Sequence, residues 1–295
     1  MNIFKIAGAV LALSTSISVP LEASAAPSRG KVLVIMSSAH ELNLRDGKKY
    51  ATGYYLNEFV VPFRKLVDAG YEPVIANPNG DMPVMDVNSN NKMFFGGDDA
   101  ARAEAEKYAK GIEQLKHPKT LASVVAEGTD GYVGVFIPGG HAPMADLLKD
   151  RNLGKILTSF HQSGRPTGII CHGPIVLLSA LSDPDAFVAS MIAGDGKANS
   201  LAAGWPYAGY RLTVFSTGEE QQLEGPSGLG GNVQFYPVNA LAEAGAHVDT
   251  VANWHSNVIV DRELITGQQP MSAPEFGDVL VKQLNAQKRP TAHKH

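Results

Sequence analysis

An apolar strand ends in a thiol within the stretch Gly168-Ile169-Ile170-Cys171-His172-Gly173-Pro174. The apolar run 175–181 follows at once and predicts a helix. A strand-to-helix elbow of this kind lifts a nucleophile above a sheet and onto a helix N-terminus. The helix dipole favours an anion there, so the position predicts a thiol that ionises more readily than usual. The alternative is a small buried apolar residue, because free cysteines are often buried.

Strand and helix patterns alternate on both sides of this elbow. Continuous apolar runs suit parallel strands buried on both faces, and helical spacing of apolar residues marks the segments between them. The order predicts an α/β fold with a doubly wound, mostly parallel sheet flanked by helices, of flavodoxin-like type. We expect the loops after Met36, Ile137 and Ile170 to converge on one crevice. The expected strands are 31–36, 71–76, 132–137 and 166–171, and the expected helices are 57–69, 145–163 and 274–286.

Two further segments complete the predicted single domain, which we place at residues 26–288. Residues 78–130 are too long for a simple connection and predict an insertion, with a helix over 98–115 that could serve as a lid. Residues 200–233 are glycine-rich and less regular, and 258–266 predict a hairpin. The tail 289–295 is expected to be flexible.

Residues 1–25 have the pattern of a cleavable export signal. Lys5 precedes an apolar run over 6–19, and Ala23-Ser24-Ala25 fits a small-x-small cleavage site. The pattern predicts a periplasmic or secreted protein that is free of the membrane after cleavage; the alternative is an uncleaved anchor. The chain of 295 residues is 44% hydrophobic and carries a net charge of −4, so no basic surface for nucleic acid is indicated. A lone cysteine in an exported chain is either a silent core residue or a reactive thiol.

Thiol chemistry needs a base near the sulfur and donors for a developing oxyanion. Gly139-Gly140-His141 follows a strand, where glycines let backbone N–H groups approach a ligand, although a plain tight turn has the same pattern. His172 could act as the base or simply cap the elbow. Glu58 lies at the start of an apolar helix, where the dipole alone would favour it. Glu219 and Glu220 follow a strand-like run and could equally be a solvated pair.

In this order, the motifs resemble those of the ThiJ/PfpI superfamily, whose fold is that of class I glutamine amidotransferase domains. The long insertion containing Phe94-Phe95-Gly96-Gly97-Asp98 resembles the larger branch of chaperone-like glyoxalase III proteins. The resemblance implies Cys171 as nucleophile with His172 beside it, Glu58 as the acid on the sulfur, and Glu220 rather than Glu219 as the triad carboxylate. It also implies an oxyanion or substrate site that we list as Gly139, Gly140, His141 and Gly173, with the backbone amides of Gly140 and His172 as donors. It implies no cofactor, and the metal ligands of one subgroup have no match here.

The function that this resemblance implies is a cysteine-dependent, glutathione-independent conversion of methylglyoxal and related α-oxoaldehydes to 2-hydroxy acids. Such an enzyme is a lyase of the glyoxalase III, or D-lactate dehydratase, type. Deglycation of early glycation adducts on proteins uses the same thiol. The alternatives are a holdase chaperone of the stress response and another cysteine-dependent hydrolase or hydratase. The implied partners are a small oxoaldehyde or a glycated protein and a second copy of the chain in a homodimer, with no nucleic acid.

Overall fold

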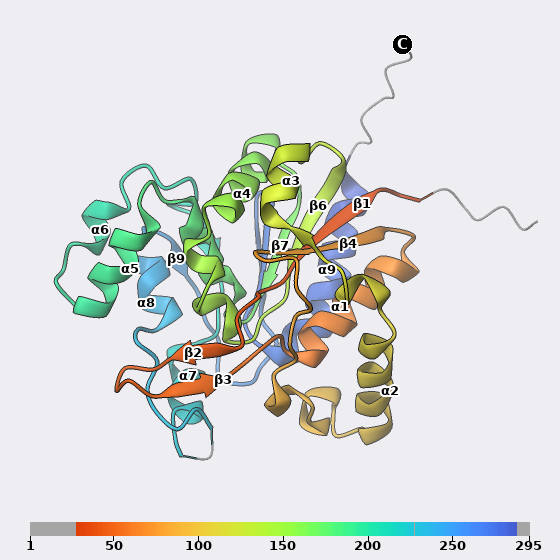
Figure 1. Ribbon diagram of the computed structural model, residues 1–295, viewed down its shortest axis with the longest axis horizontal. Helices are drawn as coiled ribbons and strands as arrows, with labels where there is room; N and C mark the ends of the chain where they lie inside the picture. The colour runs from red at the N-terminus through yellow and green to blue at the C-terminus, as the bar shows by residue number, and fades with distance from the viewer. Residues whose placement is uncertain (1–27, 227, 288–295) are drawn as a thin grey trace, which may run out of the picture.

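The computed structural model describes residues 28–226 and 228–287, which form a seven-stranded sheet with helices on both faces (Figure 1). The strand order is β10-β11-β7-β6-β1-β4-β5, and all neighbours are parallel except the β10–β11 pair. The predicted doubly wound, mostly parallel α/β fold is therefore confirmed. The strands are β1 (Lys31–Ile35), β4 (Glu72–Asn77), β5 (Lys119–Thr120), β6 (Tyr132–Ile137), β7 (Thr167–Ile170), β10 (Val258–Asp261) and β11 (Leu264–Gly267).

The central strands are mostly apolar because each face of the sheet is buried under its own layer. Along β1, Val32 and Val34 pack into one hydrophobic cluster, while Leu33 and Ile35 pack into the other. The first cluster includes side chains of α1 (Leu56–Asp68) and α9 (Ala273–Ala286), which contact each other. The second includes side chains of α3 (Leu121–Glu127), α4 (Arg151–Ser163) and η6 (Gly173–Ala180). Successive side chains point to opposite faces, so a strand between two layers has no polar side.

The segment 78–130 divides into two parts. The first contains η1 (Val87–Ser89), η2 (Lys92–Phe95), α2 (Asp99–Lys110) and η3 (Glu113–Leu115), and α2 packs on α1. The second contains β5, which pairs with β4 and forms an edge of the sheet, and α3. The helix expected over 98–115 ends at Lys110, because the chain turns at Gly111 into η3. The part of the segment that borders the candidate site is not α2 but the stretch around Met85 and Phe94, which contacts Tyr54 and Tyr55.

Two other expected helices differ from the observed ones. The helix predicted over 145–163 begins only at Arg151, where Asp150 accepts the Leu153 N–H as N-cap, and η4 (Ala142–Met144) and η5 (Leu147–Lys149) precede it. The run after the elbow is the 3₁₀ helix η6 rather than an α-helix. The hairpin expected over 258–266 is β10 and β11, and β11 also pairs in parallel with β7.

The remaining elements lie around the strand ends. They are β2 (Glu41–Asn43), β3 (Lys49–Ala51), α5 (Pro184–Ala193), α6 (Ala198–Leu201), β8 (Arg211–Leu212), α7 (Thr217–Leu223), α8 (Pro237–Glu243), β9 (His247–Val248) and η7 (Pro270–Ser272). In the described part of the chain, no helix combines the length and apolar character needed to cross a membrane. The export signal expected at 1–25 and the tail expected at 289–295 lie outside the described residues.

Candidate active site

The candidate nucleophile lies where two neighbouring parallel strands end. β6 and β7 pair in parallel, so the turn 138–141 after β6 and Cys171 after β7 leave the same edge of the sheet. The loop after β1 also starts at this edge, where Ser38 hydrogen bonds Asp81 and Asp146. The first two loops supply Cys171, His172 and the turn Gly139-Gly140-His141, whereas the acidic groups come from other elements.

Cys171 is held in a strained backbone conformation between two distant segments. Its φ is +64°, in the left-handed region that non-glycine residues rarely adopt. Its N–H donates to the Gly267 carbonyl (2.8 Å), and its carbonyl accepts the Phe215 N–H (2.9 Å). Such strain costs about 1–3 kcal/mol and persists only when the surroundings impose it. The elbow predicted from the sequence is therefore clamped by the end of β11 on one side and the segment before α7 on the other.

Cys171, His172 and Glu220 form a continuous hydrogen-bonded chain. The Cys171 Sγ lies 3.3 Å from His172 Nδ1, and His172 Nε2 lies 2.7 Å from Glu220 Oε2. The ionised carboxylate only accepts, so Nε2 carries the proton and Nδ1 offers its lone pair to the thiol. Burial, and then the charge of His141, lowers the pKa of His172 to about 4 against the opposing effect of Glu220. His172 is thus a neutral base at pH 7, with its acceptor nitrogen on the sulfur.

The two acidic residues of α7 have different roles. Glu219 caps its own helix: its side chain accepts the Ser216 N–H, and it also accepts the Trp254 N–H and the Gln268 amide. Glu220, one residue on, points to His172 instead. Burial alone would raise the pKa of Glu220, but the charges and hydrogen bonds of its histidine neighbours lower it well below the usual range. Glu220 is therefore the carboxylate in contact with the histidine.

Glu58 also lies next to the thiol, fully buried in the first turn of α1. Burial raises its pKa to about 8, although the Cys171 thiol and the Gly139 backbone N–H act as donors that lower it. Among the described residues, neither carboxyl oxygen has a partner with the geometry of a full hydrogen bond, so we regard both donors as poorly aligned. A carboxyl group with this pKa is largely protonated at pH 7 and can exchange a proton with a neighbour.

The thiol is harder to ionise than the elbow motif predicts. Burial and then the negative charge of Glu58 raise the pKa of Cys171 well above its usual value. The backbone N–H groups of Gly140 and His172 point toward the sulfur and lower the pKa, but they do not outweigh burial. The prediction of an easily ionised thiol is therefore wrong for the resting site. The prediction assumed that the thiol lies at the exposed N-terminus of an α-helix. In the structure Cys171 is desolvated and precedes a 3₁₀ helix.

The glycines of the two motifs differ in what they permit. A Cβ on Gly139 would overlap Cys171 and a carboxyl oxygen of Glu58, so only glycine lets the turn approach both. Gly140 has a φ of +97° and presents its N–H to the sulfur. Gly173, which we listed with the substrate-binding residues, is packed against Ile169, whose Cγ2 would be 2.6 Å from a Cβ there. Gly139 and Gly140 therefore shape the site, whereas Gly173 packs beneath the elbow.

The sequence did not predict that His141 also binds the triad carboxylate. Its Nε2 lies 2.7 Å from Glu220 Oε1, and its ring lies 3.8 Å from the His172 ring, centroid to centroid. The sequence predicts His141 as an oxyanion or substrate-binding residue; in the structure its Nε2 contacts Glu220. One signal was available, because His141 and His172 follow the ends of adjacent strands.

Asp86 is a second buried acid near this cluster that the sequence did not indicate. It accepts hydrogen bonds from the Tyr50 hydroxyl, the Thr52 hydroxyl and the Asn88 N–H. The edge of the Tyr50 ring in turn meets the His141 ring, 5.7 Å between centroids. The site thus extends from the sulfur through two histidines to a polar network around Asp86.

His141, His172 and Glu220 also have the composition of a metal site. Their ligand atoms lie within 4.8 Å of one another, and all three side chains are buried. Each Nε2, however, lies at the 2.7 Å distance of a charge-assisted hydrogen bond to the carboxylate. Hydrogen bonds therefore engage both Nε2 atoms and both carboxylate oxygens of this group.

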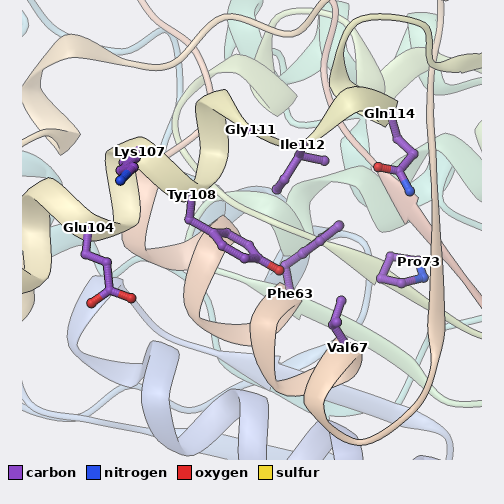
Figure 2. A pocket seen from close by; sticks show the side chains of 9 residues that line it. All are labelled: Phe63, Val67, Pro73, Glu104, Lys107, Tyr108, Gly111, Ile112 and Gln114. Atoms are coloured by element: carbon purple, nitrogen blue, oxygen red, sulfur yellow. The ribbon is translucent and has the colours of Figure 1, made fainter. Parts of the chain in front are cut away.

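A hollow of about 540 Å³ lies elsewhere, between α1 and α2 (Figure 2). The Tyr108 ring of α2 and the Phe63 ring of α1 meet there edge to face, and Arg64 covers the Tyr108 ring. None of the residues that line it belongs to the group around Cys171. Residues of two packed helices line much of the hollow, and the acid among them, Glu104, pairs with Arg64 (2.8 Å).

Known proteins resemble this chain both in sequence and in fold. Residues 50–183 match the family model described as the DJ-1/PfpI family. The protein/nucleic acid deglycase HchA of Staphylococcus aureus (strain bovine RF122 / ET3-1) is 28% identical over 258 residues, covering 86% of this chain and 80% of the relative. The structure of glyoxalase III from Candida albicans aligns with a TM-score of 0.64 at 22% identity, covering 86% and 97% of the two chains. The Rapid Encystment Protein of Francisella tularensis aligns with a TM-score of 0.62 at 23% identity, covering 86% and 99%.

Proposed function

Because the chain belongs to the DJ-1/PfpI (ThiJ) superfamily and to its glyoxalase III-like branch, we propose that it converts α-oxoaldehydes such as methylglyoxal to 2-hydroxy acids, using its own thiol in place of glutathione. The observation that carries this proposal is the hydrogen-bonded series from Cys171 through His172 to Glu220, with Glu58 next to the sulfur. This arrangement supplies a nucleophile, a neutral base and a carboxyl group whose pKa lies near neutrality.

In the proposed reaction, His172 Nδ1 takes the thiol proton as the sulfur attacks the aldehyde carbon. A C–S bond forms, Glu58 gives its proton to the former carbonyl oxygen, and the product is a hemithioacetal. Glu58, now a carboxylate, removes the proton from C1 while protonated His172 gives its proton to the C2 oxygen, and an enediol results. Glu58 then returns the proton to C2 as the C1 hydroxyl gives its proton to His172, which leaves a thioester of the 2-hydroxy acid. Water hydrolyses the thioester, releasing the acid and restoring the thiol. The net change is addition of one water to the oxoaldehyde, with no external oxidant or reductant.

The raised pKa of Cys171 suits this order of events. A thiol that stays protonated at rest does not attack until a proton acceptor and an electrophile are both in place. The N–H groups of Gly140 and His172, which face the sulfur, are then positioned to stabilise the oxygen of the adduct. Desolvation thus keeps the thiol protonated at rest, while the two backbone N–H groups remain beside the sulfur.

The test is a glutathione-free assay of methylglyoxal conversion to lactate. We expect Cys171→Ala to abolish turnover and Glu58→Gln to lower kcat by roughly 10²–10⁴-fold, the range for loss of general acid–base catalysis. Glu113→Gln, at a site where the side chain is 75% exposed, is the matched control and should leave kcat unchanged. Unchanged turnover by Cys171→Ala would refute the proposal.

Deglycation is a variant of the same function, supported by the deglycase name of the staphylococcal relative. Early adducts of methylglyoxal on amines contain a carbon that the same thiol could attack. We had expected no nucleic-acid substrate, and the relative's name makes glycated nucleotides a necessary arm of the assay beside glycated peptides. The holdase alternative is separated by the same variant: aggregation suppression that persists in Cys171→Ala, without turnover in the wild type, would favour binding over catalysis.

Export and dimerisation are part of the proposal as well. The pattern of residues 1–25 supports export, and N-terminal sequencing of the protein recovered from the periplasm or medium should begin close to residue 26. The homodimer rests on the family resemblance alone. Sedimentation of the purified protein should give twice the mass of the chain.

A further inference from the structure

A single buried carboxylate binds both histidines of the site. Glu220 Oε1 lies 2.7 Å from His141 Nε2, and Glu220 Oε2 lies 2.7 Å from His172 Nε2. The side chains of all three residues are at most 2% exposed, so water does not compete for these bonds. Each oxygen of the carboxylate therefore has its own histidine donor.

This sharing restricts the orientation of the carboxylate. Because His141 binds Oε1 and His172 binds Oε2, rotation of the carboxylate would break both hydrogen bonds. Because the carboxylate accepts from His172 Nε2–H, the Nδ1 atom remains the acceptor facing the sulfur at 3.3 Å. If Glu220 rotated away, His172 could adopt the other tautomer and turn an N–H toward the thiol.

The fold holds His141 from several sides. It follows Gly140, whose positive φ brings the turn against the Gly53 carbonyl and leaves no room for a Cβ. The His172 ring lies against one side of the His141 ring, and the edge of Tyr50 meets it from β3. The charged groups that act on it are Glu220 and Glu224 from α7 and its end, and Asp86 from the start of η1.

We propose that His141 is a positioning residue of the triad, whose Nε2–H holds Oε1 of Glu220 so that Oε2 orients His172 toward the Cys171 thiol. The reacting group is thus a four-residue unit, Cys171–His172–Glu220–His141. Its kinetic consequence rests on the proposed function, but its effect on thiol reactivity does not. Burial lowers the pKa of His141, but the charge and hydrogen bond of Glu220 and the charge of Asp86 outweigh burial and raise the pKa.

Three variants test this role. His141→Leu removes the donor with little change in size, whereas His141→Gln can restore an N–H near the same position. The control is His161→Leu, because His161 also pairs with a glutamate, Glu263, 2.9 Å away. Glu263 precedes β11, at the opposite end of that strand from Gly267 and the elbow. Losing this second His–Glu pair therefore shows how far removal of any such pair changes alkylation and turnover in this fold.

The first readout is alkylation of the chain's single cysteine by iodoacetamide across pH, which needs no substrate. We expect His141→Leu to slow alkylation at pH 7 by roughly tenfold, because a charge-assisted hydrogen bond that orients the base is lost. His141→Gln should recover most of the rate, and His161→Leu should leave it unchanged. Nitrogen-15 NMR of the histidine rings should show His172 with Nδ1 unprotonated in wild type and with mixed tautomers in His141→Leu.

The second readout is methylglyoxal turnover, in which kcat should fall by roughly 10–100-fold in His141→Leu while KM changes less than about twofold. Alkylation and His172 tautomer that are the same in His141→Leu and wild type would overturn the proposal, as would equal losses in the His161→Leu control. If wild type has no oxoaldehyde turnover but alkylation still slows only in His141→Leu, the proposed function fails and the positioning role stands.

Discussion

Replacing Glu58 by glutamine should change how the stability of the protein depends on pH. The folded state raises the pKa of this carboxyl group from 4.5 to about 8, mainly through burial. A raised folded pKa means that the proton binds more tightly in the folded state. The stability of the wild type linked to this proton is therefore fully present below about pH 4.5 and is lost as pH rises through 8.

The magnitude follows from the size of the change. At about 1.36 kcal/mol per pH unit, the rise from 4.5 to about 8 amounts to at most about 5 kcal/mol of unfolding free energy. Sharing of the proton with the Cys171 thiol reduces this figure. Glutamine cannot ionise, so the difference in unfolding free energy, Glu58→Gln minus wild type, should grow from pH 5 to pH 9 by several kcal/mol.

Urea unfolding of both proteins at whole pH units from 5 to 9 measures this difference. The other titrating groups largely cancel because they are common to both chains. Glu113→Gln, with its exposed side chain, should show a difference within about 0.5 kcal/mol at every pH. A Glu58→Gln difference that is flat from pH 5 to pH 9 would refute the reasoning, because it would mean that burial does not penalise the carboxylate.

Three further outcomes are expected. Gly139→Ala should destabilise the protein by about 1–3 kcal/mol and slow thiol alkylation, because the added Cβ overlaps Cys171 and Glu58. The control Gly131→Ala, where the space is open, should do neither. Urea unfolding and iodoacetamide kinetics measure the two effects. The alkylation rate of wild type should keep rising with pH through 9.0 without a plateau. Glu58→Gln should lower the pH of half-maximal rate, because a negative charge beside the sulfur is removed. A pH profile that is the same in Glu58→Gln and wild type contradicts this second expectation. Glu220→Gln should lower the free energy of unfolding by about 3–5 kcal/mol near neutral pH. This loss should shrink below pH 4.5, because a carboxylate with a depressed pKa contributes its full stability only above its unfolded pKa. Chemical unfolding of the variant and wild type at pH 7 and pH 3.5 measures both losses.

The fold was predictable because its signals are periodic. The apolar run of β1 indicates a strand buried on both faces, and its alternate side chains do enter two different clusters. The elbow at Cys171 was also predictable, because the strand and turn residues that form it follow one another directly in the sequence. The choice of Glu220 rested on spacing from Phe215 in the family pattern, and a single step along α7 separates it from Glu219, which caps the helix.

What the sequence did not indicate depends on contacts between distant segments. The sign of the thiol pKa shift was wrong because burial of Cys171 is a property of the packed site, not of the elbow motif. The 3₁₀ form of η6 could not be read from its apolar run, which has no clear helical face. The second histidine on Glu220 and the network at Asp86 require the exact path of two loops, and no spacing rule encodes that path.

The clamp on Cys171 also has a consequence for how the protein is made. Its N–H is held by Gly267, 96 residues later in the chain, and its carbonyl by Phe215. A ribosome that has just produced the thiol has therefore not yet produced the residues that give the elbow its left-handed geometry. The reactive conformation can form only after the chain has been extended past β11 and this C-terminal hairpin has docked beside β7. A chain truncated before β10 would carry every member of the Cys–His–Glu set and still lack the scaffold that aligns them.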